Sequence, residues 1–166
     1  MLHGARVIRS DLIANDQDDL SKYRYEFFLW RTRWNSYTNP LSSDLNWNYI
    51  QLLSSERQLI PDVSGIYALV LKPGIANHHF VSYLMYIGQT TSLKRRFGDY
   101  LSECSNPDRM KVFKMIRLYS NLLWFYYASV PAEQLTPVED SLLETYIPPI
   151  NSRFPTTIRH AVAAFR

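Results

Sequence analysis

Hydrophobic residues near the start of the chain recur every three to four positions. In residues 19–34 charged residues separate them, and they are Leu20, Tyr23, Phe27 and Trp30. Residues 42–59 repeat the pattern after a turn-like stretch in which Asn39-Pro40 interrupts a helix. Such spacing is typical of amphipathic helices. It predicts a mostly helical N-terminal extension, residues 1–58, whose aromatic residues pack against the rest of the fold.

From residue 59 onward, runs of strand-forming residues replace the helical spacing. Residues 64–72 and 83–89 are two such runs, and the turn residues between them predict an antiparallel hairpin with a long loop, 72–82. Residues 122–130, "LLWFYYASV", predict a third strand.

Two helices are predicted between the second and third strands. Residues 90–103 begin with hydroxyl side chains suited to a helix N-terminus, although Gly98 weakens the pattern. Residues 107–120 form a cleaner helix. Its apolar stripe consists of Val112, Phe113, Ile116 and Tyr119.

A third helix, residues 136–147, has a marked beginning and end. Thr136 is placed as N-cap, with Pro137 at the first helical position and Glu139 three residues after the cap. Pro148-Pro149 then ends the helix.

The order strand, strand, helix, helix, strand, helix predicts an α+β domain. It covers residues 59–152 and contains a small three-stranded, largely antiparallel sheet flanked by helices. Residues 153–166 are expected to form a basic C-terminal tail with a short helix.

Composition narrows the class of protein only slightly. The net charge of +3 and the pI of about 9.0 fit a polyanionic partner such as DNA without requiring one. Cys104 is the single cysteine, which excludes an intramolecular disulfide or a cysteine-based zinc site and favours a reducing, cytoplasmic location. Residues 118–132 lack charged side chains but are too short and aromatic to span a membrane, so no membrane partner is expected.

Two tripeptides in the predicted hairpin, Gly65-Ile66-Tyr67 and Tyr86-Ile87-Gly88, each place a tyrosine near a glycine. With the residues that follow them, they resemble the GIY-YIG nuclease superfamily, metal-dependent enzymes that hydrolyse phosphodiester bonds in DNA. In the repair-nuclease branch, the second tripeptide is followed by a turn, Leu, two variable residues, Arg, and Tyr four residues later. Leu93, Arg96 and Tyr100 fit this frame, which selects Arg96 rather than Arg95 as the functional arginine.

A distant second motif supports the resemblance. In the family, a metal-binding glutamate opens a helix and is followed by two aliphatic residues, a proline and an asparagine. The matching residues are Glu139, Leu142, Leu143, Pro148 and Asn151. Glu144 is too close to Asn151 to take the place of Glu139. The chain departs from the family in its longer hairpin loop and in Gln89, where many members have lysine.

The resemblance implies a catalytic set on one patch: Tyr67, Tyr86, Arg96, Glu139 and Asn151. Glu139 would bind Mg²⁺ or Mn²⁺, since hard divalent cations prefer oxygen ligands. Arg96 would bind phosphoryl oxygens through its planar donor fork. Tyr67 would act as general base or orient the attacking water, and because a phenol has a pKa of about 10 it would need help from the metal or Arg96.

Each of these residues also has a structural interpretation. Tyr67 and Tyr86 suit ordinary strand positions, and Arg96 suits a solvated cation among three. Glu139 suits a capping box, and Asn151 suits a turn after two prolines. It is the joint agreement with one family's spacing that favours an active site. The adjacent histidines His78 and His79 are more typical of exposed loop residues than of a metal site.

A further set of residues is expected to contact the DNA: Lys94, Arg95, Tyr100, Arg109, Lys111, Lys114 and Arg117. Contacts of cations with the backbone give affinity without sequence choice, so the loop 72–82 and the N-terminal extension are the expected specificity elements. A compact core of this kind looks like a restriction-type or defence endonuclease, for which cutting both strands would favour a homodimer. Two alternatives stay open: a structure-specific repair or recombination nuclease, and a non-catalytic DNA-binding domain on the same scaffold.

Overall fold

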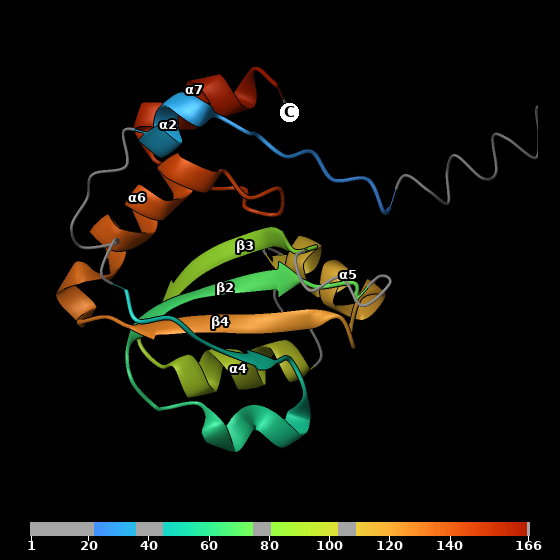
Figure 1. Ribbon diagram of the computed structural model, residues 1–166. Helices are drawn as coiled ribbons and strands as arrows, with labels where there is room; N and C mark the ends of the chain where they lie inside the picture. The colour runs from blue at the N-terminus through green and yellow to red at the C-terminus, as the bar shows by residue number, and fades with distance from the viewer. Residues whose placement is uncertain (1–21, 36–44, 75–80, 103–108, 166) are drawn as a thin grey trace, which may run out of the picture.

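The computed structural model describes residues 22–35, 45–74, 81–102 and 109–165 (Figure 1). Its centre is an antiparallel sheet of four strands in the order β1-β4-β2-β3. The strands are β1 (Asn48–Gln51), β2 (Gly65–Leu71), β3 (Tyr83–Thr90) and β4 (Leu123–Ser129). The predicted α+β class, the β2–β3 hairpin and the strand at β4 are confirmed, and the sheet has one strand more than expected.

The additional strand, β1, lies where the hydrophobic spacing predicts a helix over residues 42–59. Residues 48–51 instead pair with 124–127 of β4, and the 3-10 helix η1 (Ser54–Leu59) follows. The helix prediction is therefore wrong for the described part of this segment. Tyr49 and Ile50 are strand formers, and pairing with the edge of β4 satisfies their backbone groups.

The segment before it also departs from the expected helix. Residues 24–30 are irregular, and only α2 (Arg31–Asn35) is helical within 22–35. The aromatic residues of the predicted stripe, Tyr23, Phe27 and Trp30, are exposed. The side chains that contact the two core clusters are instead Tyr25 and Phe28. The predicted positions Leu20 and Asn39-Pro40 lie outside the described residues.

Two of the predicted domain helices form as expected. Helix α4 (Leu93–Leu101) has Ser92 as its N-cap, whose side-chain oxygen accepts a hydrogen bond of 3.1 Å from the Arg95 backbone N–H. Helix α5 (Met110–Leu118) buries four apolar residues, and its cations at positions 111, 114 and 117 are exposed. The buried residues are Val112, Phe113, Met115 and Ile116.

Helix α6 (Leu135–Tyr146) begins two residues earlier than predicted, with Gln134 in place of Thr136 at the N-cap position. The 3-10 helix η4 (Ala132–Gln134) runs directly into it, so Thr136 is not the N-cap and no capping box forms with Glu139. The predicted end is confirmed, because Ile147 adopts a left-handed conformation with φ 45° immediately before Pro148. Helix α7 (Thr156–Ala163) is the short helix expected in the tail.

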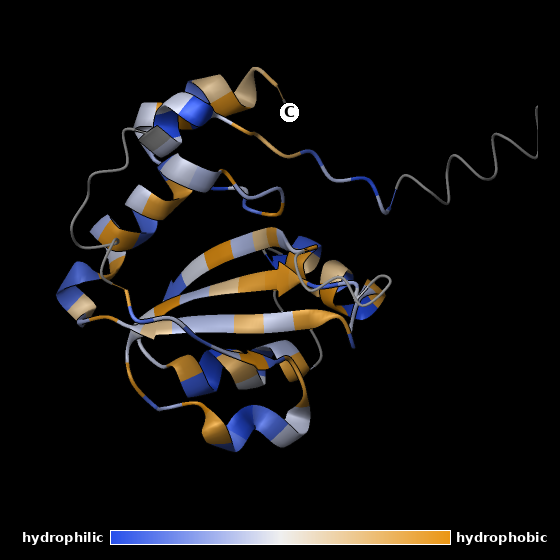
Figure 2. Cartoon of the chain, in the orientation of Figure 1, coloured by the Kyte–Doolittle hydropathy of each residue, from blue (hydrophilic) through white to orange (hydrophobic). Residues whose placement is uncertain are grey.

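The sheet is covered on both faces by the helices. Successive strand residues point to opposite faces, so Tyr67 and Leu69 of β2 join the core beneath α4 and α5, whereas Ile66 and Ala68 join the core beneath α6 and α7. Figure 1 shows α4 and α6 on opposite sides of the sheet. Hydrophobic residues accordingly concentrate in the strands, and η1 is largely hydrophilic (Figure 2). None of the described helices has the length and apolar character needed to span a bilayer.

Candidate active site

A cleft of about 710 Å³ opens where α5, α6 and the segment 150–159 meet beside β3. Tyr86 of β3 and Glu139 of α6 line it. Burial of Tyr86 raises the pKa of its phenol, and the carboxylate of Glu139 raises it further. The two residues, selected separately from the sequence motifs, thus share one cleft and act on each other electrostatically.

The free edge of β3 is closed by the chain that follows α6. The Ile150 N–H donates to the Met85 carbonyl over 3.1 Å. The Asn151 side chain then pairs with Ile87 like a neighbouring strand: its Nδ2 donates to the Ile87 carbonyl over 2.8 Å, and its Oδ1 accepts from the Ile87 N–H over 3.0 Å. Asn151 is only 5% exposed. It therefore fixes the Tyr86-Ile87-Gly88 segment that presents a tyrosine to the cleft.

Tyr67 lies beside Tyr86 but deeper in the protein. Their ring centroids are 6.1 Å apart, and Tyr67 is only 2% exposed. The hydroxyl groups of Tyr67 and Tyr100 form a hydrogen bond of 2.9 Å. Gly88 makes this packing feasible, because a Cβ atom at that position would lie 2.4 Å from the Tyr67 hydroxyl oxygen.

Burial keeps the tyrosine phenols protonated at neutral pH. It raises the pKa of Tyr67 well above the ordinary value, with further increases from Tyr100 and Tyr86 that the positive charge of Arg96 only partly offsets. Burial likewise raises the pKa of Tyr100. Both groups are therefore neutral hydrogen-bonding groups and not phenolates in the absence of a bound cation.

Arg96 projects from α4 towards these tyrosines and lowers the pKa of all three. Its side chain is 11% exposed, and its Nη1 lies 3.5 Å from an Asp99 carboxylate oxygen, which also lies 3.7 Å from Nη1 of Arg109. Nε and Nη1 of Arg96 are buried without a hydrogen-bond partner among the described residues. Arg96 is not among the residues that line the cleft, so its charge acts there from behind the tyrosines.

Glu139 is held by Gln89 of β3. Gln89 Nε2 donates to the Glu139 carboxylate over 2.7 Å and also contacts the Thr136 hydroxyl at 3.2 Å. Burial raises the pKa of Glu139 and neighbouring Asp140 adds to this, while the bonds from Gln89 act in the opposite direction. Gln89 thus positions a carboxylate whose charged form is disfavoured by burial.

The donor set fits a hard divalent cation held mainly by water and substrate. Glu139 and Asp140 both line the cleft, and carboxylate oxygens are the ligands that Mg²⁺ prefers. No group of three or more His, Cys, Asp or Glu side chains able to enclose a metal occurs within the described ranges. A cation here would need oxygen ligands from outside the protein to complete its coordination.

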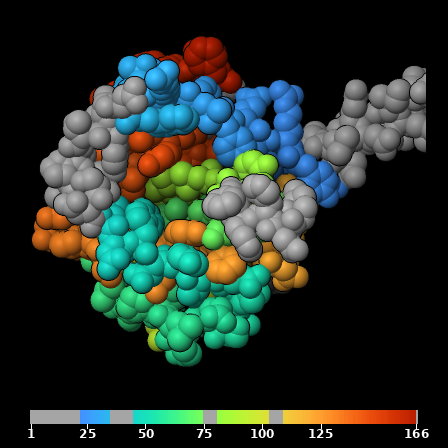
Figure 3. Space-filling model, viewed as in Figure 1, coloured from blue at the N-terminus to red at the C-terminus, as the bar shows by residue number. Residues whose placement is uncertain are grey.

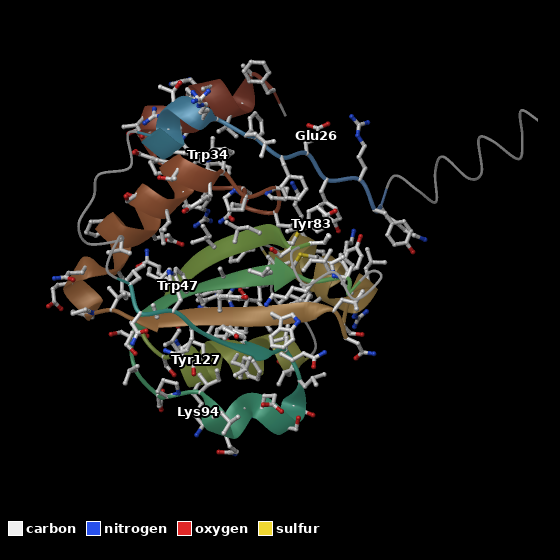
Figure 4. All side chains as sticks on the ribbon, in the orientation of Figure 1. Glu26, Trp34, Trp47, Tyr83, Lys94 and Tyr127 are labelled. Atoms are coloured by element: carbon white, nitrogen blue, oxygen red, sulfur yellow. The ribbon has the colours of Figure 1, made fainter. Side chains whose placement is uncertain are left out.

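The residues expected to contact DNA are spread over the molecule. Arg109 and Lys111 line the cleft, whereas Lys94 lies on the α4 side of the sheet, away from α6 (Figure 4). Tyr100 is buried at 2% exposure beneath the cleft residues. The other three, Arg95, Lys114 and Arg117, are exposed and do not line the cleft.

Two cations of the cleft are absent from the residues expected to contact DNA. Arg153 and Arg159 line it from the segment after α6 and from α7, and the Arg159 guanidinium also donates to the Phe154 carbonyl. The basic composition of the tail was the signal that could have indicated them. Their place in the cleft depends on the way the chain turns back after Asn151.

Comparison with solved structures finds the GIY-YIG N-terminal endonuclease domain of UvrC from Thermotoga maritima. This domain bound to its catalytic divalent cation, magnesium, is 23% identical with a TM-score of 0.42, over 58% of this chain and 92% of that chain. Two point mutants of the domain, bound to the catalytic divalent cation, are 22% identical with TM-scores of 0.42 and 0.43, over 60% of this chain and 93% of theirs. No protein-family model and no curated protein matches this chain.

Proposed function

We propose that this chain is a metal-dependent endonuclease of the GIY-YIG type, which hydrolyses phosphodiester bonds in DNA within the cleft described above. The observation that carries the proposal is the meeting of Tyr86 and Glu139 on one cleft wall. These residues come from different motifs and different elements. Ordinary strand packing and helix capping would not require them to converge, and the cap expected of Glu139 is not formed.

Glu139 is the residue that would hold Mg²⁺ or Mn²⁺, with Asp140 beside it. When bound, such an ion supplies charge neutralisation at the phosphoryl oxygens and the departing 3′ oxygen. Gln89 orients the Glu139 carboxylate by a side-chain hydrogen bond to one of its oxygens. This is the role we give to the position where many family members have lysine.

Tyr86 is the phenol that can contact a bound substrate, because it lines the cleft whereas Tyr67 lies behind it. Its raised pKa makes it a proton-bearing group that orients the attacking water or a phosphate oxygen. Tyr67, bonded to Tyr100, acts as a positioning residue for Tyr86. Of the two roles expected for Tyr67, its burial favours orientation over general-base catalysis.

Arg96 does not line the cleft, and its Nε and Nη1 are buried, so it acts on the phosphoryl group through its positive charge from behind the tyrosines. Arg109 and Lys111 on one side of the cleft, and Arg153 and Arg159 on the other, are the cations we assign to the flanking phosphates. These cations would hold the DNA backbone in the cleft beside the Glu139 carboxylate.

Cleavage assays on several DNA substrates test the function and its subclass together. Wild-type protein is incubated with plasmid, linear duplex, flap and four-way junction DNA in Mg²⁺ or EDTA, and the product ends are mapped. Cleavage of unmodified plasmid or viral DNA at defined sites supports a restriction-type or defence enzyme. Cleavage confined to flaps or junctions supports the repair or recombination alternative.

Arg96→Ala separates catalysis from DNA binding, and Arg57→Ala, at an exposed arginine of η1 outside the cleft, is its matched control. Arg96→Ala is expected to lower the cleavage rate by at least about 10²-fold, as the loss of preorganised electrostatic stabilisation does. DNA binding measured in EDTA should remain. If wild-type protein cleaves no substrate in either metal, the endonuclease proposal is wrong and the non-catalytic alternative stands.

A further inference from the structure

Among the described residues, α6 and α7 cover the part of their sheet face around Ile66 and Ala68 but leave Tyr49 of β1 exposed. Strand residues directly opposite one another point to the same side, and the register places Tyr49, Tyr126 and Ala68 in one such row. Ala68 is buried beneath α6, but Tyr49 at the far edge of the sheet is 56% exposed. Figure 3 shows parts of β1 (teal) and β4 (orange) side by side on the surface of this face. An aromatic surface therefore continues outward from the core.

Three rings form this surface, which we call the aromatic face: Tyr49, Trp124 and Tyr126. Tyr49 stacks on Tyr126 with centroids 5.0 Å apart and an interplanar angle of 22°. Trp124 lies 5.8 Å from Tyr49 at 60°. Trp124 and Tyr126 are partly buried, so the rings are held in place by the sheet while Tyr49 stays accessible.

A cation sits at the centre of the aromatic face. The Lys72 ammonium lies 4.6 Å from the Trp124 centroid and 4.9 Å from those of Tyr49 and Tyr126. Within the described part of the chain Lys72 has no carboxylate partner, and none of the four strands contains Asp or Glu. The face is thus aromatic and positively charged.

Flat rings with a neighbouring cation fit a ligand that offers π-faces and negative charge together. Unpaired nucleotides meet both requirements, since their bases stack on aromatic side chains and their phosphates attract cations. Bases within a duplex are already stacked on each other, so duplex DNA would meet only the charge requirement. An acidic peptide offers charge without a sequence of π-faces.

We propose that Tyr49, Trp124, Tyr126 and Lys72 form a binding site for the unpaired bases of single-stranded nucleic acid. None of these residues lines the cleft that contains Glu139. The site is therefore a second nucleic-acid contact that goes beyond the proposed cleavage reaction. It would give a nuclease a means to select substrates that carry a single-stranded segment.

The test measures binding in EDTA, where no metal-dependent cleavage occurs, so its result is separate from that of the cleavage assay. Fluorescein-labelled oligo(dT), oligo(U) and a duplex are titrated with protein and followed by fluorescence anisotropy. Tyr49→Leu removes the exposed ring and Tyr49→Phe retains it. Lys72→Gln removes the charge, and Phe165→Leu, which removes a 71% exposed ring at the other end of the molecule, is the matched control.

Tyr49→Leu is expected to weaken single-strand binding at least about fivefold, the loss of one base–aromatic stack, with little change for the duplex. Tyr49→Phe and Phe165→Leu should bind like wild type. Lys72→Gln should reduce the slope of log K against log salt by about 0.7 for single strands. The proposal is overturned if neither oligo(dT) nor oligo(U) binds to the wild-type protein. It is also overturned if Tyr49→Leu leaves single-strand binding unchanged, or if sedimentation shows that this substitution changes only the self-association of the protein. Circular dichroism of each variant checks that the sheet is retained.

Discussion

Replacing Asn151 by alanine tests whether this residue acts through the structure of β3. The side chain exchanges two hydrogen bonds with the Ile87 peptide, at 2.8 Å and 3.0 Å, and both residues are at least 95% buried. Alanine removes both bonds and leaves the N–H and C=O of Ile87 without their partner. The segment that carries Tyr86 should therefore become less stable and less precisely placed.

The size of the effect follows from those two bonds. Each is worth about 1 kcal/mol net, and a buried backbone group left unsatisfied adds about 1–3 kcal/mol unless water reaches it. The strand lies at an edge, where water can compensate in part, so we expect a loss of about 2–4 kcal/mol in the free energy of unfolding. At about 2–4 °C per kcal/mol for a chain of this size, the melting temperature should fall by roughly 4–16 °C.

Thermal and urea unfolding followed by circular dichroism measure this loss. Asn48→Ala is the matched control, because Asn48 is exposed and its side-chain amide makes a single long contact of 3.4 Å with the Asn46 carbonyl. Its effect should stay within about 0.5 kcal/mol. If Asn151→Ala unfolds with the same free energy as the control, the edge-sealing role is refuted, and any loss of cleavage in that variant would point to direct participation in the reaction.

Three further predictions concern the site and its supports. Gly88→Ala should lower stability by about 1–3 kcal/mol in urea unfolding, because the new methyl group overlaps the Tyr67 phenol; an unchanged midpoint would contradict the packing. In metal-free buffer, the raised pKa of Glu139 means that its carboxylate costs stability increasingly as the pH rises above the ordinary value of 4.5, so Glu139→Gln should gain stability relative to wild type from pH 4 to neutral pH. A difference in stability that does not vary with pH would refute this. Ser92→Ala should cost about 1 kcal/mol through loss of the bond from the Arg95 N–H, measured by thermal unfolding; a loss below a few tenths would count against the cap.

Local signals predicted the elements that form the domain's centre. The strand runs of β2, β3 and β4 are rich in β-branched and aromatic residues, and α5 has one apolar stripe, so neighbouring residues suffice to specify each element. The residues at Tyr86 and Glu139 could be selected because they belong to motifs with fixed spacing. Their meeting in one cleft required the structure.

The errors arise where a distant part of the chain decides the local conformation. Tyr49 and Ile50 have helical spacing with their neighbours, but they form a strand because their backbone pairs with the edge of β4. Gln89 acquires its role only when α6 brings Glu139 to it. Arg153 likewise lies in the cleft because Asn151, two residues before it, is hydrogen-bonded to β3. None of these contacts can be predicted from the local pattern of hydrophobic and polar residues.

The central claim is that Glu139 serves as the metal-binding carboxylate of an active cleft. Single-turnover DNA cleavage in Mg²⁺, at saturating protein, compares wild type with Glu139→Gln and with Glu133→Gln, an exposed glutamate in η4 outside the cleft. Loss of the carboxylate should lower the rate at least about 10²-fold at unchanged DNA affinity, while Glu133→Gln cleaves at the wild-type rate. Equal cleavage by wild type and Glu139→Gln would contradict the account.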